Sequence, residues 1–130
     1  MSNEIFKLKE LSAKLGNDLS LIQASGGNTS IKLDGKLWVK ASGKKLKNAL
    51  NEDIFVSLDL IKIRNELAIN KSKKELNFKN ICGSSLRASI ETSLHAIMPY
   101  KVVLHTHSVD TIAISLMSNS TNYLDELMKN

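Results

Sequence analysis

Apolar residues near the start of the chain recur every three or four positions, at Ile5, Leu8, Leu11 and Leu15. This spacing puts them on one side of a helix, so it predicts an amphipathic helix over residues 3–15 that ends near Gly16. A helix with a single apolar face has to bury it, and we expect this one to pack on a sheet.

The pattern then changes from helical spacing to alternation, in TSIKLDGKLWVKASG (29–43). Residues 30–33 and 36–40 read as two short strands, and Asp34-Gly35 between them is a dipeptide that favours a tight type I′ turn. The segment therefore predicts a β-hairpin. DIFVSLDL (53–60) is rich in residues that favour strands and predicts a third one.

The remaining segments carry weaker signals. KKLKNAL (44–50) predicts a short helix, whereas residues 64–84 are polar, rich in lysine and weakly periodic, which indicates a strand fragment and loops. SIETSLHAIM (89–98) has helical spacing, a candidate N-cap at Ser89 and a stop at Pro99. KVVLHTH (101–107) predicts a buried strand. A helix opened by Ser108 or Asp110 would run through Met117, and another would begin within 120–130. We expect one mixed α/β domain over residues 1–130 with at least one antiparallel strand pair.

Length and composition are typical of one folded domain, because 130 residues with 42% hydrophobic content can bury a real core. No apolar run approaches the roughly 20 residues that cross a bilayer, and the mixed-charge N-terminus does not read as a signal peptide. We therefore expect a cytoplasmic protein without a membrane partner. Cys82 is the single cysteine, cannot form an internal disulfide, and is expected to be a small buried apolar residue.

The net charge of +5 arises mainly from lysines scattered along the chain. Nucleic-acid binding would be better supported by arginine and aromatic residues in one patch, and aromatics make up only 5% of this chain. We expect no nucleic-acid partner. A mild positive field instead favours a small anionic substrate.

The chain's three histidines, His95, His105 and His107, lie within 13 consecutive residues. Side chains at i and i+2 of a strand share a face, so His105 and His107 can present two imidazoles to one ion. Glu91 lies four residues before His95 on the preceding helix and adds a nearby carboxylate. Such a set suits zinc, which binds nitrogen and carboxylate oxygen. The alternative is that the histidines simply pair with backbone groups or acids.

Two glycine-rich segments flank the hairpin, ASGGNTS (24–30) and KASGKKL (40–46). Glycine allows close approach of the backbone, and the adjoining hydroxyl and amide groups can bind a phosphate. Both segments can equally be plain turns. Neither has the spacing of a P-loop or of a Rossmann fingerprint.

In order along the chain, SGGNTS, LDGKLWVKASG, RASIETSLH and VVLHTHS resemble the successive motifs of the class II aldolase and adducin family. That family includes fuculose-phosphate and rhamnulose-phosphate aldolases and ribulose-phosphate 4-epimerases. The resemblance covers about residues 5–120. The residues of its glycine-rich and hairpin motifs are most similar to those in the aldolase-like part of rhamnose-type aldolase/dehydrogenase proteins. It implies an α/β fold of the α+β type, with three α/β/α layers around a mainly antiparallel sheet.

The resemblance also implies a zinc-dependent aldolase that cleaves a carbon-carbon bond of a sugar phosphate by a retro-aldol step. Zn²⁺ or another divalent metal would bind His105 and His107, and Glu91 would be the acid/base carboxylate, which can also reach the empty metal. His95 matches a supporting helix histidine, and Ile90 replaces a second serine of some members. The phosphate positions implied are Gly27, Asn28, Ser42, Gly43 and Ser89.

The sequence departs from the family pattern after His107. Members are longer, with a third zinc-binding histidine downstream and a C-terminal tyrosine that donates a proton, and Tyr123 comes too early for that role. We therefore expect the C-terminal part of the family fold to be missing. Four explanations are open. The chain is half of a split protein that a C-terminal polypeptide complements, or it is a short member that has lost catalysis. Otherwise it is a fragment, or a protein in which Glu91 or His95 replaces the third ligand.

Three functional hypotheses follow from these observations. The first is an aldolase-like sugar-phosphate enzyme or enzyme half, and the second is a non-catalytic aldolase/adducin-like module for binding or assembly. The third is an unrelated α/β domain with structural histidines. A shortened fold leaves sheet edges and apolar surface uncovered, so we also expect a homo-oligomer or a complementing partner.

Overall fold

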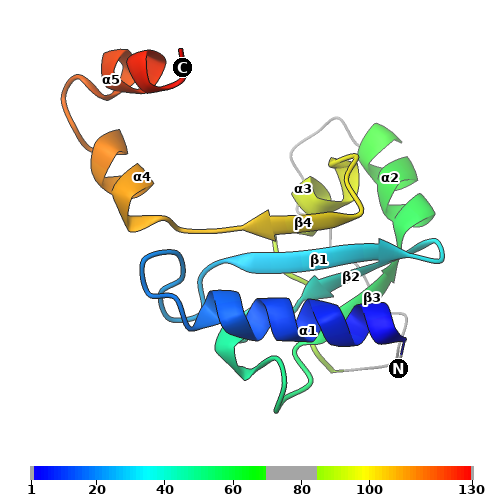
Figure 1. The fold of residues 1–130 in the computed structure, drawn as a ribbon. Coiled ribbons are helices and arrows are strands. Elements are labelled where there is room, and N and C mark those ends of the chain that lie inside the picture. Colours follow the sequence, from blue (N-terminus) through cyan, green and yellow to red (C-terminus); the bar gives the residue numbers. More distant parts are fainter. Residues whose placement is uncertain (1, 70–84, 130) are drawn as a thin grey trace.

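A computed structural model of the protein describes residues 2–69 and 85–129. Its centre is an antiparallel sheet with the strand order β3-β2-β1-β4 (Figure 1). The strands are β1 (Asn28–Leu33), β2 (Lys36–Lys40), β3 (Phe55–Asp59) and β4 (Val102–His105). The mainly antiparallel sheet expected from the resemblance is confirmed.

The β1–β2 hairpin turns on the two residues that the sequence indicates. Asp34 and Gly35 both have positive φ, at 49° and 72°, and Leu33 pairs with Lys36 across the turn. Positive φ at both central residues is the signature of a type I′ turn, whose twist matches that of the flanking strands. The predicted hairpin is confirmed, and β1 begins two residues earlier than predicted.

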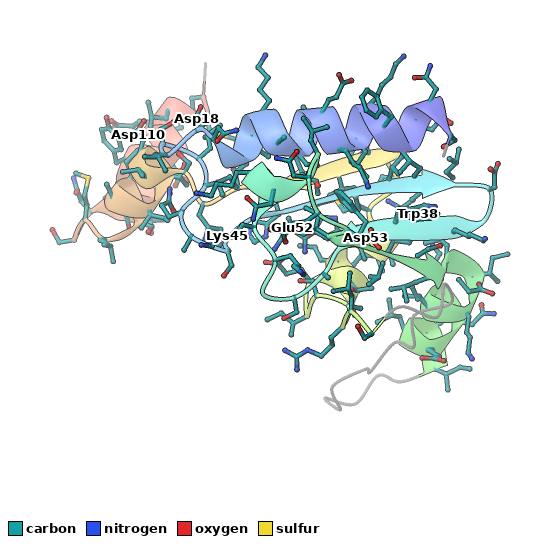
Figure 2. The ribbon with its side chains drawn as sticks, turned by 90° about the horizontal axis from the view of Figure 1, so that it is seen from below. Asp18, Trp38, Lys45, Glu52, Asp53 and Asp110 are labelled. Atoms are coloured by element: carbon teal, nitrogen blue, oxygen red, sulfur yellow. The ribbon has the colours of Figure 1, made fainter. Side chains whose placement is uncertain are left out.

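Helices cover both faces of this sheet (Figures 1 and 2). Helix α1 (Asn3–Gly16) buries Ile5 and Leu8 on one face, in a core that includes Ile31 and Phe55. On the other face, α2 (Leu60–Ile69) and α3 (Thr92–Ile97) cover a second core. Its members are Leu37, Val39, Ala41, Val56, Leu58, Leu60, Ile63 and Ala96. Because successive strand residues face opposite ways, the three α/β/α layers follow from the alternation of the strands.

Helix α2 corrects one prediction. Residues 64–69, predicted as a strand fragment and loops, continue a helix that begins directly after β3. The carboxylate of Asp59 accepts a hydrogen bond from the backbone N–H of Lys62 at 2.8 Å, which caps the first turn. Only Leu60 and Ile63 of this helix are buried, so its apolar face is too narrow to give a clear helical period. Cys82 and the rest of 70–84 lie outside the described residues.

The structure of β4 also differs from the prediction for its segment. The segment 101–107 was predicted to be a buried strand, yet Val103 is its only buried residue, and the neighbouring Val102 and Leu104 are exposed. The physical reason is position, because β4 pairs with β1 alone and forms an edge of the sheet in the described part of the chain. The strand ends at His105, so His107 lies in the segment that follows it.

The remaining helices are short. A 3₁₀ helix, η1 (Leu46–Asn48), follows β2 as predicted. Helix α3 starts at Thr92, later than Ser89, whose carbonyl accepts the N–H of Thr92 at 3.1 Å. The predicted C-terminal helices are α4 (Val109–Ser115), capped by Ser108, and α5 (Ser120–Leu127). They extend beyond the end of β4, away from the sheet, and bury no residue (Figure 1). No helix within 2–69 or 85–129 is long and apolar enough to cross a membrane.

Helix α1 and η1 approach each other closely at Gly16. A Cβ atom placed there would lie 2.2 Å from the backbone nitrogen of Lys47. We expect Gly16→Ala to lower the free energy of unfolding by about 2 kcal/mol or more, because backbone atoms would have to move. Urea denaturation measures this. The exposed Glu10→Ala variant in the same helix is the control, and equal midpoints for the two variants would contradict the prediction.

Candidate metal centre

Strand pairing brings the predicted histidines to the glycine-rich loop. Asn28, the first residue of β1, pairs with His105, the last residue of β4. Beyond the strand, the backbone N–H of His107 donates to the carbonyl of Leu21 at 2.8 Å. Gly26 lies directly against this imidazole, since a Cβ atom at Gly26 would be 2.8 Å from Nδ1 of His107. The absence of a side chain at Gly26 therefore makes room for the ring.

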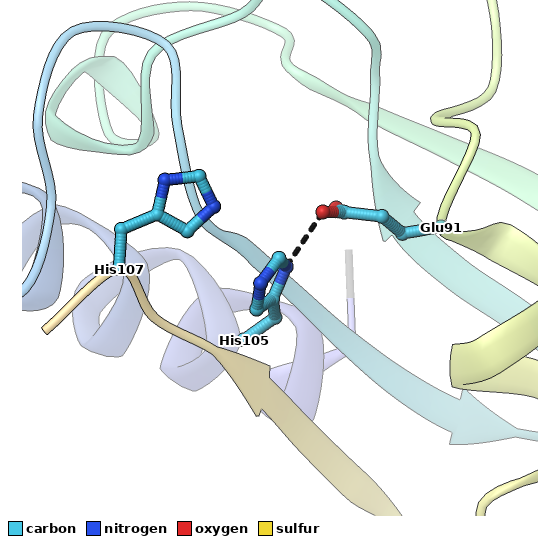
Figure 3. Close-up of side chains that lie close together, drawn as sticks. All are labelled: Glu91, His105 and His107. Carbon is cyan, nitrogen blue, oxygen red and sulfur yellow. Dashed lines mark ion pairs between the residues drawn. The ribbon is translucent and has the colours of Figure 1, made fainter. Parts of the chain in front are cut away.

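Glu91 reaches the same place from the turn before α3. Its Oε2 accepts hydrogen bonds from Nδ2 of Asn28 at 3.0 Å and from the hydroxyl of Ser89 at 3.3 Å. Its Oε1 lies 2.6 Å from Nδ1 of His105 (Figure 3). One carboxylate oxygen is thus held by neutral donors, while the other faces the histidine.

Together these residues make a candidate metal site. Glu91, His105 and His107 each offer a ligand atom, and the three atoms lie within 4.8 Å of one another. The two imidazoles meet edge to face, with centroids 4.9 Å apart. All three side chains are half-buried, so an ion could reach them. Two nitrogens and a carboxylate oxygen are ligands that zinc accepts, and three protein ligands leave a further position open for substrate.

The surroundings of the His105 imidazole support a metal site here. Its Nδ1 is buried and makes no hydrogen bond of regular geometry to any described residue, despite the short separation from Glu91. The contact between the two residues is therefore a close approach without an aligned N–H. A buried polar atom without a partner is costly, and a bound cation would satisfy both groups.

His95 takes a different place from the other two histidines. It is fully buried in α3, where its Nδ1 lies 2.7 Å from the hydroxyl of Ser30 in β1. Its Nε2 has no partner among the described residues, which costs about 1–3 kcal/mol of folding free energy. Burial lowers the pKa of His95 from 6.5 to about 4, and the charge of Glu91 opposes this only in part. His95 does not belong to the group formed by Glu91, His105 and His107.

Lys40 is a residue of this region that the sequence analysis passed over. Its side chain is buried, and its ammonium donates to the carbonyl of Ser25 at 3.1 Å and to that of Lys44 at 2.8 Å. Burial lowers its pKa, and the negative charge of Glu91 acts against that shift. Lys40 therefore joins the two glycine-rich loops. Its position at the end of a strand, as the first residue of the second glycine-rich segment, was the only signal for it in the sequence.

The predicted phosphate positions occupy the same side of the fold. Asn28 and Ser89 contact Glu91, while the hydroxyl of Ser42 accepts a hydrogen bond from Arg87 at 3.2 Å. The loop after β2 lies next to the segment before Glu91, because Ala41 forms a bridge with Ala88. Gly27 and Gly43 have positive φ, and the space beside Gly43 is open. Binding of phosphate by these residues stays a prediction.

The fold places this chain in the aldolase-like superfamily. The chain belongs to the class II aldolase and adducin N-terminal domain family, whose pattern matches residues 7–129. The resemblance found in the motifs is thus confirmed. Members of the family generally use a divalent metal ion, in keeping with the donors at Glu91, His105 and His107.

Two relatives give the extent of the similarity. One is the solved N-terminal class II aldolase domain of a conserved protein from Thermoplasma acidophilum, with a TM-score of 0.72, 26% identity and coverage of 91% of this chain and 61% of that chain. The other is "Uncharacterized oxidoreductase YuxG" from Bacillus subtilis (strain 168), 32% identical over an alignment 130 residues long that covers 89% of this chain and 19% of that protein. The chain thus spans about a fifth of the length of this curated relative.

The buried His95 predicts how stability depends on pH. Unfolded His95 takes up a proton below pH 6.5, whereas folded His95 does so only near pH 4. The free energy of unfolding should therefore fall as pH drops through this window, with His95 contributing up to about 3 kcal/mol. Urea denaturation between pH 7 and pH 4.5 measures the slope. His95→Leu should flatten it, and an unchanged slope in that variant would rule out His95 as the source.

Proposed function

We propose that this domain binds a divalent metal, zinc foremost, and takes part in retro-aldol cleavage of a carbon-carbon bond in a phosphorylated sugar. The observation that carries the proposal is the convergence of Glu91, His105 and His107 beside the loop that holds Gly26. Family membership supports the aldolase class, and the donor chemistry supports the metal. A bound divalent cation would supply Lewis-acid polarisation of the carbonyl and hydroxyl oxygens of the substrate.

The chain's own residues divide the remaining work. His105 and His107 hold the cation, and Glu91 moves the proton on the donor carbon during the reverse condensation. The hydrogen bonds from Asn28 and Ser89 fix one oxygen of that carboxylate and leave the other free to take up or release the proton. Glu91 would help to hold the cation in the enzyme without substrate and would serve as the base in the enzyme with substrate.

The glycine-rich loops would bind the substrate phosphate. Backbone amides at Gly27 and Gly43 and the hydroxyl of Ser42 are donors of the kind that phosphate requires. The hydroxyl of Ser89 donates to Glu91 and would have to turn away from that carboxylate to join them. Lys40 adds a positive charge where the two loops meet, which attracts an anion to this position. Holding the phosphate orients the reacting carbons against the metal and Glu91.

A second candidate is a binding or assembly module of the same fold, without catalysis. It is favoured by α4 and α5, which bury no residue and expose Ile112, Leu116 and Leu127. Apolar faces of this kind are suited to a second copy of the chain or to a complementing C-terminal polypeptide. Under either candidate the protein would act in the cytoplasm, without nucleic acid or membrane as a partner.

Metal binding provides the first test. We expect the purified protein to bind Zn²⁺ with a stoichiometry of one, and Glu91→Gln, His105→Ala or His107→Ala to weaken binding by roughly 100-fold or more, because each removes a donor. Isothermal titration calorimetry measures the affinity. Glu52→Gln removes a carboxylate that pairs with Lys44 elsewhere and should leave the affinity unchanged. Equal affinities for Glu52→Gln and Glu91→Gln would refute the site.

Catalysis is tested separately. The zinc-loaded protein, alone or together with a polypeptide that supplies the C-terminal part of the family fold, should split a ketose phosphate into an aldehyde and a smaller ketose phosphate. Product formation can be followed with a coupled assay over a panel of ketose phosphates. Metal binding without cleavage in either arrangement, together with a stable oligomer that survives chelation, would favour the assembly module instead.

A further inference from the structure

One side of β1 carries a row of polar residues that hold the segment from Glu91 to Tyr100. Asn28, Ser30 and Lys32 alternate along the strand and therefore face the same way, towards α3. The amide of Asn28 donates to Glu91 at 3.0 Å, the hydroxyl of Ser30 lies 2.7 Å from Nδ1 of His95, and the ammonium of Lys32 donates to the carbonyl of Tyr100 at 2.8 Å. Three polar contacts thus fasten this segment to one strand.

The middle contact is the only one of the three that is closed to solvent at both ends. Ser30 and His95 are fully buried, whereas the side chain of Glu91 is 26% exposed and the bond of Lys32 lies at the surface. Water competes with hydrogen bonds that it can reach and cannot compete with a buried one. The Ser30–His95 contact is therefore the most persistent of the three.

This contact acts on Glu91 through one turn of backbone. The N–H of His95 donates to the carbonyl of Glu91 at 3.1 Å, so His95 and Glu91 are the two ends of the first turn of α3. From this backbone position the carboxylate of Glu91 reaches to 2.6 Å from Nδ1 of His105. If the turn moves, the bond from Asn28 to Glu91 and the approach to His105 are disturbed together.

We propose that His95 is a positioning residue, which through its buried contact with Ser30 fixes the helical turn that carries Glu91 and so holds the Glu91 carboxylate towards His105. The inference rests on the proposed function, since it matters to the extent that Glu91 serves the metal site. In this role His95 is not itself a metal ligand, since it lies outside the group formed by Glu91, His105 and His107. Its effect on metal binding is indirect, as is usual for residues that orient a ligand from behind.

The same strand offers a matched control on its opposite face. The hydroxyl of Thr29 lies 2.7 Å from that of Ser12 in α1, and both residues are fully buried. This pair resembles Ser30–His95 in burial and in length, but it faces away from Glu91. Loss of either pair should disturb the core, whereas only loss of Ser30–His95 should disturb the candidate metal site.

The experiment compares Ser30→Ala, His95→Leu, His95→Asn and Thr29→Val in the full chain. Two quantities are measured: the dissociation constant for Zn²⁺ and, in the metal-free protein, the NMR signals of the Asn28 side-chain amide, which report its bond to Glu91. Asparagine at 95 keeps a polar group near the position of Nδ1, so His95→Asn tests rescue. Thermal unfolding of each variant separates a loss of stability from a loss of position.

We expect Ser30→Ala and His95→Leu to raise the dissociation constant by about 10-fold or more and to shift the Asn28 amide signals towards those of a solvent-exposed asparagine. His95→Asn should recover most of the affinity, and Thr29→Val should change neither quantity, whatever its effect on stability. Unchanged Asn28 signals in Ser30→Ala and His95→Leu would overturn the inference, and so would an equal loss of affinity in Thr29→Val.

The two proposals can fail independently of each other. A wild-type protein that binds no Zn²⁺ would remove the proposed function, and the Asn28 signals alone would then decide whether His95 positions Glu91. A wild-type protein that binds Zn²⁺ with an affinity indifferent to Ser30 and His95 would leave the proposed function intact and remove this inference.

Discussion

The register between β1 and β4 is the constraint on which the candidate site depends. It sets Asn28 opposite His105 and Ser30 opposite Val103, and thereby decides which side chains of β1 face α3. A slip of one residue would turn Asn28 and Ser30 towards α1 and carry Thr29 and Ile31 to the other face. The register is secured from both faces, because Ile31 is buried in the core under α1 while Ser30 is held by His95.

The site combines few charges with many neutral donors. Glu91 is the one carboxylate of the cluster, and it is oriented by an amide and a hydroxyl, which do not neutralise it. Its negative charge therefore stays available to a cation or to the imidazole of His105. Lys40 supplies the compensating positive charge from the glycine-rich side, where backbone carbonyls satisfy it. Opposite charges thus lie on the two sides of the site, with Glu91 on one side and Lys40 on the other.

Local signals in the sequence predicted the local parts of this fold. The spacing of Ile5 and Leu8 located α1, and Asp34-Gly35 located the hairpin turn, because each pattern reflects one element and its own geometry. Helix α2 was missed because only two of its positions are buried. The edge position of β4 was missed because an apolar run does not indicate how many neighbouring strands a strand will have in the sheet.

The site was predictable in its members and less so in its contacts. His105, His107 and Glu91 were expected to meet, and they do. Glu91 and His95 were expected four residues apart on one helix. In the structure Glu91 lies at the cap and turns to His105, while His95 enters the core. Asn28 and Glu91 are 63 positions apart, and the contacts of Lys40 depend on two loops. Such pairings arise from the folded topology, and spacing along the chain carries no trace of them.

The order of the strands also bears on how the chain reaches this fold. β1, β2 and β3 follow one another closely, whereas β4 comes only after α2 and α3 and then covers the outer edge of β1. During synthesis β1 is therefore an edge strand for as long as β4 has not emerged, and an exposed edge can pair with another chain. Its composition counters this hazard, since Asn28, Thr29, Ser30 and Lys32 make it a poor template for association. Two of these polar residues, Asn28 and Ser30, later hold the segment that carries Glu91, so they serve the nascent chain before they serve the candidate site.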